Sequence, residues 1–425
     1  MAGQMAALKL SQRLGVFYGW IVVGGLVMIS TVASGTGQYT FGVFVKPFME
    51  EFLASRAAVS ATVSIYWIGM GLSGPFMGRL MDAYGPRKII LLAGVLNTIT
   101  LVFLSLSTAL WHVYALYAMK SLAHSAIATV GIGALVSRWF FEKRGMAMGF
   151  GVTSFGLGGL LLIPLTGYLI PQIGWRMVYL TLAVMVIVVT LPIATFVLKN
   201  TPEEMGLFPD GKNDPIAPKA QLAVTPLSQS SQLEGSALHR AVRTASFWFL
   251  AVAFFLVGMS VFGTMTHQIP YLTDMGISVE AAAVALGFTA GMGILGKLVW
   301  GYLSDRLQVR YVAMLCFSIQ ALGVLILMQA TGLAMVWVYV VVFGFAMGGL
   351  AVMMGVLPMS VFHSKSIAPI LGAIALAMSF GAALGPFVAG YIFDLLGNYT
   401  LSFMIFLVAY ALAVTATYAA RPRKT

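Results

Sequence analysis

The stretch that decides the fold is AAAVALGFTAGMGILGKLVWGYLS, which runs from Ala281 to Ser304. It is apolar and carries a single charged residue, Lys297. As an α-helix these residues would extend ~36 Å, which is long enough to cross the hydrocarbon core of a bilayer. The stretch therefore predicts a membrane-spanning helix, with Lys297 about 12 Å inside the helix end marked by Asp305.

Lys297 is the residue of this stretch that needs an explanation. A charged side chain within a span is costly and rare, and it usually marks a functional site. Small residues share its face, namely Gly287, Ala290, Gly293 and Gly301, which favours a cavity or a close neighbour over lipid. We hypothesise that Lys297 binds an anion. The alternative is that its long side chain only extends to the inner interface.

Composition places almost the whole chain in a membrane. Of its 425 residues 60% are hydrophobic and 9% are charged, which excludes a soluble globular domain. The net charge of +11 does not indicate nucleic-acid binding, because the basic residues are spread over short loops. The single cysteine, Cys316, excludes a disulfide framework and a cysteine-based metal site.

Apolar segments divide the chain into two similar halves. We expect an N-terminal six-helix half at 1–198, a proline-rich cytoplasmic linker at 199–244 and a C-terminal six-helix half at 245–425. The twelve expected spans are 17–44, 58–80, 89–108, 111–136, 145–169, 174–198, 245–272, 279–304, 311–331, 334–360, 366–391 and 399–420.

Lysine and arginine residues set the expected orientation. With both termini cytoplasmic, nineteen of them lie on the inner side and two, Lys120 and Lys297, lie within spans. Only Lys46, Arg56 and Arg176 then lie outside. This bias predicts a multi-pass protein of the cell's inner (plasma) membrane with cytoplasmic termini.

One short pattern recurs at the second span of every three-span unit. Its four copies are GRLMDAYG from Gly78, GYLIPQIG from Gly167, GYLSDRL from Gly301 and GYIFDLLG from Gly390. Four copies in register indicate four three-helix repeats arranged in two six-helix halves.

Four segments carry a resemblance to a known family. GRLMDAYGPRK, from Gly78 to Lys88, resembles the loop 2–3 signature of the major facilitator superfamily. Tyr18-Gly19-Trp20 and RWFFEKRGMAMG at 138–149 resemble the two signatures of the monocarboxylate transporter family, a look shared by oxalate:formate antiporters. TPEEMGLFPDG at 201–211 is similar to bacterial members. The resemblance implies an all-α membrane fold with a central cavity lined mainly by spans one, four, seven and ten.

The resemblance also implies a role for Lys297. Related carriers have arginine at this position of span eight, where it binds the substrate carboxylate. Lysine keeps the charge but loses the planar fork that grips a carboxylate with two hydrogen bonds.

Span four offers a second charged group. Lys120 and His124 are four residues apart, so they share a face, and Tyr117 lies one turn earlier. This arrangement fits a second cavity cation with a titratable neighbour. The alternative places Lys120 near the outer boundary, where it would reach the interface.

Spans one and ten supply further candidate substrate contacts. Ser34 and Gln38 continue a polar stripe on span one, and Tyr339 and Phe343 share one face of span ten. Both sets also fit ordinary helix packing.

His267 and Asp274 lie at the outer end of span seven. Histidine titrates near neutral pH. In bacterial carriers that this chain resembles, a histidine and an aspartate here are linked to proton-coupled uptake. The alternative is an ordinary polar loop rim. Asp82, Arg87 and Asp305, in contrast, belong to the cytoplasmic signature loops, where their expected role is gating by contacts that hold one conformation.

These features favour a secondary active transporter for small monocarboxylates, lactate- or pyruvate-like, coupled to protons by alternating access. The alternative is exchange of oxalate- or formate-type anions, which two buried lysines would suit. No convergent catalytic set indicates an enzyme. We expect a monomer in the bilayer whose partners are a carboxylate and protons, with no metal, cofactor or nucleic acid.

Overall fold

The structure is a computed structural model that describes residues 16–211, 238–362 and 367–420. In this part of the chain the regular elements are helices, and no strand is present. The elements up to the predicted linker are α2 (Tyr18–Ser34), η1 (Gly35–Tyr39), α3 (Phe41–Phe52), α4 (Arg56–Tyr84), α5 (Pro86–Ser105), α6 (Leu110–Ile127), α7 (Thr129–Trp139), α8 (Arg144–Pro192) and η2 (Ile193–Val197).

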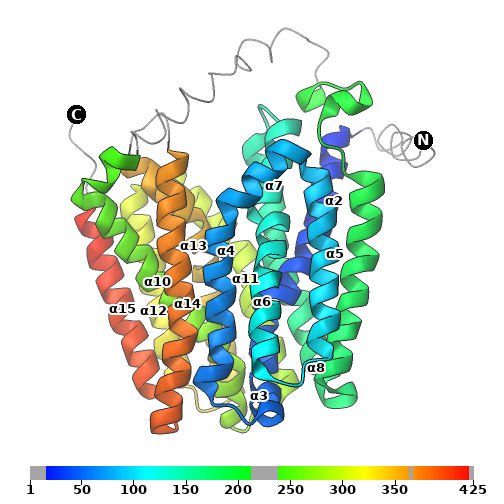
Figure 1. Cartoon of the computed structure of the whole chain (residues 1–425). Helices are drawn as coiled ribbons and strands as arrows, with labels where there is room; N and C mark the ends of the chain where they lie inside the picture. The colour runs from blue at the N-terminus through cyan, green and yellow to red at the C-terminus, as the bar shows by residue number, and fades with distance from the viewer. Residues whose placement is uncertain (1–15, 212–237, 363–366, 421–425) are drawn as a thin grey trace. The chain divides into compact units, whose positions relative to one another are not determined.

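The remaining elements are two short 3-10 turns followed by six long helices (Figure 1). They are η3 (Pro202–Met205), η4 (Pro209–Gly211), α10 (Ala245–Asp274), α11 (Val279–Arg306), α12 (Val309–Met328), α13 (Leu333–Val361), α14 (Ala368–Leu396) and α15 (Thr400–Ala419).

Eleven segments of the described residues are long and apolar enough to cross a membrane. One of them, Arg144–Val197, holds two predicted spans. It changes direction at Gly174, whose φ of 74° is a left-handed conformation that glycine adopts without strain. Divided there, the helical segments agree with the twelve spans expected from the sequence, except that span four consists of two helices, α6 and α7, that meet at Ala128.

Span one differs from its prediction as a single helix over 17–44. After α2 the backbone widens into the π-helical turn η1, closed by a hydrogen bond from Thr40 N to Gly35 O of 3.2 Å. A Cβ added at Gly35 would lie 2.7 Å from the carbonyl oxygen of Gly158, so close contact with α8 accompanies this turn. The chain is then helical again as far as Phe52, which places Lys46 in a helix and not in a loop.

The chain forms two compact units. Unit 1 comprises Met1–Thr40, Leu72–Leu162 and Leu169–Ala223, and unit 2 comprises Phe41–Gly71, Ile163–Tyr168 and Val224–Thr425. These units do not coincide with the predicted halves, because α3 and the first part of α4 pack with the C-terminal helices. The division at 198 and 245 stays a prediction.

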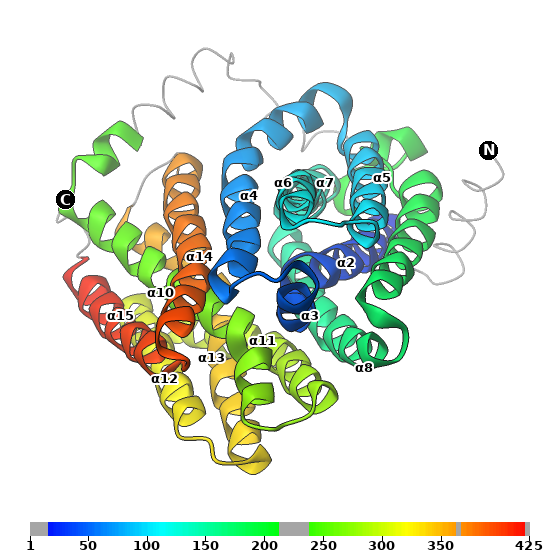
Figure 2. The same ribbon diagram turned by 60° about the horizontal axis from the view of Figure 1, so that its bottom comes forward.

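Within unit 1, α6 packs against α2 and α5, and α7 contacts the same two helices. Within unit 2, α10 packs against α14, α15 and α3, while α13 lies between α11 and α12 (Figure 2). Glycines permit these approaches. A Cβ at Gly385 of α14 would overlap the carbonyl oxygen of Met259 on α10, and one at Gly296 of α11 would overlap that of Phe345 on α13.

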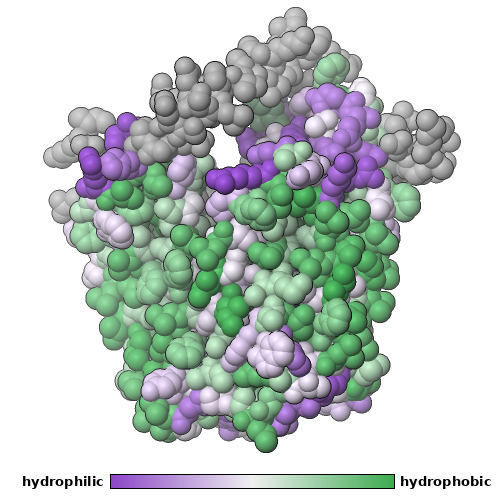
Figure 3. All heavy atoms as spheres, in the orientation of Figure 1, coloured by the Kyte–Doolittle hydropathy of each residue, from purple (hydrophilic) through white to green (hydrophobic). Residues whose placement is uncertain are grey.

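Apolar side chains cover the sides of the helices, and hydrophilic residues gather at the helix ends (Figure 3). More than half of the surface of Leu92, Phe103, Leu298, Val338 and Leu395 is exposed. An apolar surface of this extent belongs in lipid and not in water. The chain is therefore a multi-pass membrane protein.

Gly385→Val should destabilise unit 2 by at least about 2 kcal/mol, because the new side chain would meet rigid backbone of α10. The matched control is Gly355→Val, since nothing lies within 4 Å of a Cβ added at Gly355. Thermal unfolding of the two purified variants measures the difference. Equal melting temperatures would show that the α10–α14 contact tolerates a larger residue.

Candidate functional site

Lys297 lies on α11, and its side chain is half-buried. The sequence predicted a cavity or a close neighbour beside the small residues of this face. At Gly293 the neighbour is α13. A Cβ added at Gly293 would lie 3.6 Å from both the Gly344 carbonyl oxygen and Gly348 Cα of α13. Gly296, adjacent to the lysine, packs against the same helix. Close packing on α13 thus fixes the rotation of α11 about its axis beside the ammonium group.

Lys120 lies inside unit 1 and does not reach an interface, because only 1% of its surface is exposed. Its Nζ has no hydrogen-bond partner among the described residues and lies 5.4 Å from the ring centroid of Tyr117. His124 is buried one turn further along α6. The Tyr117 hydroxyl lies 3.1 Å from that of Tyr179 on α8, a residue that sequence reasoning did not select.

The candidates on spans one and ten are placed by helix packing. Ser34 is fully buried, and Gln38 lies half-buried in the π-helical turn. Tyr339 and Phe343 are also fully buried, with ring centroids 5.2 Å apart, and the Tyr339 hydroxyl donates a hydrogen bond of 2.9 Å to Gln268 Oε1. Their contact with a substrate stays a prediction.

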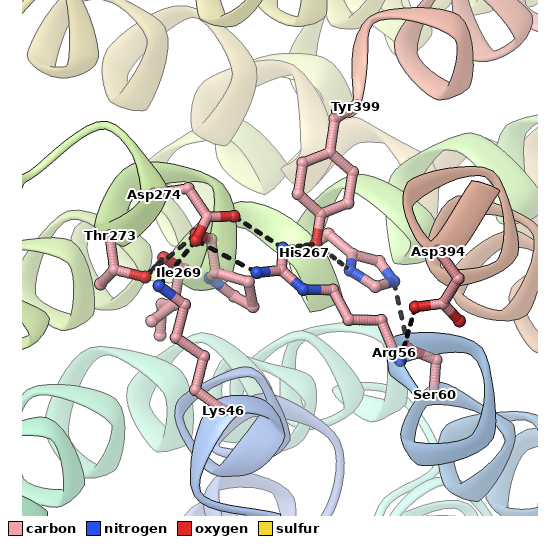
Figure 4. A network of polar contacts seen from close by, with 10 residues as sticks. Lys46, Arg56, Ser60, His267, Ile269, Thr273, Asp274, Asp394 and Tyr399 are labelled. Carbon is pink, nitrogen blue, oxygen red and sulfur yellow. Dashed lines mark hydrogen bonds and ion pairs between the residues drawn. The ribbon is translucent and has the colours of Figure 1, made fainter. Parts of the chain in front are cut away.

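Asp274, the last residue of α10, holds two cations from other helices (Figure 4). Lys46 Nζ of α3 lies 2.7 Å from Asp274 Oδ1. Arg56, the first residue of α4, donates from Nη1 and Nη2 to the two carboxylate oxygens, at 2.7 and 3.1 Å. Bidentate ion pairs between a guanidinium and a carboxylate are among the strongest and most directional charged hydrogen bonds in proteins.

His267 lies two turns before Asp274 and is completely buried, so it is not part of a polar loop rim. Its Nδ1 is 2.8 Å from the hydroxyl of Tyr399, and its Nε2 is 2.8 Å from the carbonyl oxygen of Pro386. Ser60 Oγ lies 3.2 Å from the same Nε2. Tyr399 also accepts a hydrogen bond of 2.7 Å from Arg56 Nη1, which joins His267 to the Asp274 pair.

Asp394 completes this cluster by capping a helix. Its two carboxylate oxygens accept hydrogen bonds from the backbone N–H groups of Arg56 and Ala57, at 2.9 and 2.8 Å. A carboxylate at a helix N-terminus satisfies free N–H groups and complements the helix dipole. Asp394 lies in the repeat copy GYIFDLLG but was not selected as a site residue, and Arg56 and Lys46 had counted only as outer-side cations.

The three predicted gating residues differ in their surroundings. Arg87 donates from Nε and Nη2 to the carbonyl oxygens of Ala194 and Thr195, at 3.0 and 2.5 Å. Asp82 is largely exposed and lies 3.5 Å from Arg138 Nη2. Asp305 is exposed at the end of α11. Gating by these residues stays a prediction.

The segments that resemble the monocarboxylate transporter family meet in unit 1. The Tyr18 ring lies 5.6 Å from that of Trp139, and the Trp20 ring lies 4.9 Å from that of Phe140. Asp210, at the end of TPEEMGLFPDG, accepts hydrogen bonds of 2.8 Å from the N–H groups of Phe141 and Glu142. The start of the predicted linker is therefore packed against the other two segments.

Membrane-spanning helices that bury a charged side chain, as α6 buries Lys120, are typical of membrane proteins that move ions or solutes. The model of the Major Facilitator Superfamily matches residues 27–375 and 292–425, so the chain belongs to that superfamily. Two solved structures share its fold. A mutant form of the nucleoside transporter NupG matches with a TM-score of 0.73 and 14% identity, over 95% of this chain and 99% of that one. A bacterial homolog of the human lysosomal transporter Spinster, inward-facing and occupied, matches with a TM-score of 0.72 and 17% identity, over 95% and 97%.

Relatives of known name agree with the predicted resemblance. Monocarboxylate transporter 13 of Bos taurus is 27% identical over 394 residues, which cover 91% of this chain and 86% of the relative. Monocarboxylate transporter 11 of Mus musculus is also 27% identical, over 91% and 84%. The oxalate:formate antiporter of Oxalobacter formigenes is 24% identical over 71% and 67%. The superfamily prediction is confirmed, and these relatives support the monocarboxylate transporter family within it.

Asp210→Asn should lower the stability of unit 1 by about 1 kcal/mol, because the two backbone N–H groups lose a charged acceptor. Glu203→Gln is the matched control, since it removes an exposed carboxylate from the same segment. Thermal unfolding in detergent measures both. A melting temperature for Asp210→Asn equal to that of the control would show that the segment does not depend on this cap.

Proposed function

We propose that this transporter carries a small monocarboxylate, lactate- or pyruvate-like, together with a proton by alternating access. The observation that carries the proposal is Lys297, a charged side chain within an otherwise uncharged stretch of α11. Binding a carboxylate there would offset part of the cost of holding an ammonium group in a span. The relatives of this chain that are named monocarboxylate transporters support this choice of substrate class.

Charge balance supports coupling to a proton. An anion that crosses alone works against the membrane potential, at about 2.3 kcal/mol per charge per 100 mV. A carboxylate and a proton together are neutral and avoid that cost. His267 and Asp274 are the proposed proton-coupling residues, and the hydrogen bonds that connect them through Arg56 and Tyr399 support this assignment.

The remaining parts of the proposal concern the setting of the transporter. We infer a monomer in the inner (plasma) membrane, with cytoplasmic termini, that acts as a carrier and not as an enzyme. Rocking of the predicted halves would alternate access to the site. Asp82, Arg87 and Asp305 would hold the cytoplasmic loops in one conformation.

One observation favours a second candidate function, the exchange of oxalate- or formate-type anions. Lys120 is a second buried ammonium group, and two such groups would suit two carboxylates. The oxalate:formate antiporter among the relatives supports this alternative. Uptake into proteoliposomes that contain no substrate separates the functions, because symport driven by external acid needs none inside, whereas exchange does.

Lys297→Ala should lower acid-driven uptake of radiolabelled lactate and pyruvate by about 100-fold or more, because the bound carboxylate loses its partner. Lys297→Arg should retain uptake within about tenfold, since the charge is preserved. Initial rates in proteoliposomes with a pH gradient measure both variants. Arg243→Ala, which removes an exposed cation ahead of α10, is the control for loss of charge alone.

Unchanged uptake by Lys297→Ala would exclude Lys297 from the binding site. A loss of uptake shared equally by the alanine and arginine variants would instead indicate that the residue acts through packing.

A further inference from the structure

Five side chains from three helices and a helix cap form one connected polar chain in unit 2. In order they are Lys46, Asp274, Arg56, Tyr399 and His267, and every link is a hydrogen bond or ion pair of 3.1 Å or less (Figure 4). We call this chain the outer network. Arg56 and Tyr399, its central members, have no role in the sequence-based hypothesis.

We infer that Arg56 and Tyr399 are positioning residues for proton coupling. They leave Nδ1 of a neutral His267 as the atom that takes up the proton, and uptake there loosens the start of α4. The inference rests on the proposed proton coupling and extends it to a defined atom and a defined motion.

The hydrogen-bond directions follow from the acceptor at one end. The carbonyl oxygen of Pro386 can only accept, so His267 Nε2 carries its hydrogen and Nδ1 of the neutral ring is the acceptor. Tyr399 must therefore donate its O–H to Nδ1. Its oxygen is left to accept the N–H of Arg56, which in turn pairs with the acceptor-only carboxylate of Asp274.

Tyr399 is suited to act as this donor. Its side chain lies at the N-cap of α15, outside the span, and is buried among the rings of Tyr271, Phe393 and Phe403. Burial raises the pKa of its hydroxyl above the ordinary value, against the opposing effect of nearby Arg56, so the O–H stays protonated.

A proton on His267 Nδ1 conflicts with these directions. The new N–H would face the Tyr399 oxygen that already accepts from Arg56, and the Tyr399 O–H would have to turn away. Two positive groups would then share one neutral oxygen, with no hydrogen donated to the ring. The charged groups around His267 are Arg56 of α4, Lys46 of α3, Asp274 of α10 and Asp394 of α14, and both carboxylates already hold donors of Arg56.

Arg56 is the residue through which this conflict reaches the backbone. Its guanidinium lies 3.5 Å above the ring centroid of Phe393 and pairs with Asp274, while its own N–H is capped by Asp394. These contacts hold the first turn of α4 to α10 and to the α14–α15 connection. Weakening the bond between Arg56 and Tyr399 therefore loosens the start of α4. The complete network requires neutral His267, so it is favoured at high pH and lost as the pH falls.

The test measures this loosening without any substrate. Val63 lies two turns after Arg56 on the same face of α4, and only 4% of its surface is exposed. In a Cys316→Ser background, Val63→Cys reports opening through its rate of reaction with a hydrophilic thiol reagent in detergent. Leu53→Cys, at a residue that is 94% exposed, gives the reference rate at each pH and removes the intrinsic titration of the thiol.

The Val63→Cys rate relative to the Leu53→Cys rate should rise severalfold as the pH falls. His267→Gln should abolish the pH dependence. Tyr399→Phe keeps the ring contacts and removes the hydroxyl that joins His267 to Arg56, so the relative rate should be raised at every pH and should lose its pH dependence. Tyr271→Phe is the matched control, because the Tyr271 hydroxyl donates to Leu327 O and not to the histidine, so this variant should keep the pH profile of the unsubstituted network.

Arg56→Lys provides a second, independent variant. It keeps the charge and loses the fork, so the relative rate at high pH should rise toward the value of the wild-type network at low pH. A flat pH profile in the otherwise unmodified Val63→Cys protein would overturn the inference. A Tyr399→Phe pH profile equal to that of Tyr271→Phe would also overturn it.

These outcomes are separate from those of the proposed function. Acid-driven uptake together with a flat thiol profile would leave proton coupling in place and remove the outer network from it. A pH-dependent thiol profile without lactate or pyruvate uptake would leave the network in place and require another substrate.

Discussion

The bilayer requires each backbone N–H and C=O group within it to find a partner in the protein, and the rest of this structure follows from that requirement. In the described residues the long apolar stretches form helices, and the backbone departs from the α-helix at places such as η1, which packs closely on α8, and Gly174, where the chain changes direction. With the backbone satisfied in this way, the function proposed above rests on a small number of polar side chains inside the spans.

That requirement also explains how far the sequence alone could lead. Helix positions follow from apolar length, and even the break inside α8 matched the predicted boundary between spans five and six. The π-helical turn η1 could not be predicted, because it accompanies contact with Gly158 and leaves no distinct residue pattern. The partners of Arg56 were equally hidden, since Asp274 lies 218 residues away and no local spacing relates the two. Only Asp394 carried a signal, through its place in the repeat.

The residues that carry the resemblance to the family differ from the residue proposed to bind the substrate. Tyr18, Trp20, Trp139 and Phe140 pack ring against ring, and Asp210 caps the segment beside them. Such contacts stabilise the packing of α2, α7 and the segment 201–211, and this packing does not depend on which substrate the protein carries. Resemblance in these motifs therefore supports the architecture strongly, while the proposed substrate class rests on an isolated position, Lys297.

The long separation between Arg56 and its carboxylate partner has a consequence for how the protein is made. At ribosomal rates of 5–20 residues per second, about 10–40 s pass between synthesis of the arginine and synthesis of Asp274. During that interval neither Asp274 nor Asp394 has been synthesised, so the guanidinium has no carboxylate from these residues. Water at the membrane surface must solvate its charge until they arrive. Assembly of this region is thus a late event in biogenesis. It occurs when the C-terminal helices insert and the Arg56 guanidinium exchanges its hydration for the ion pair with Asp274.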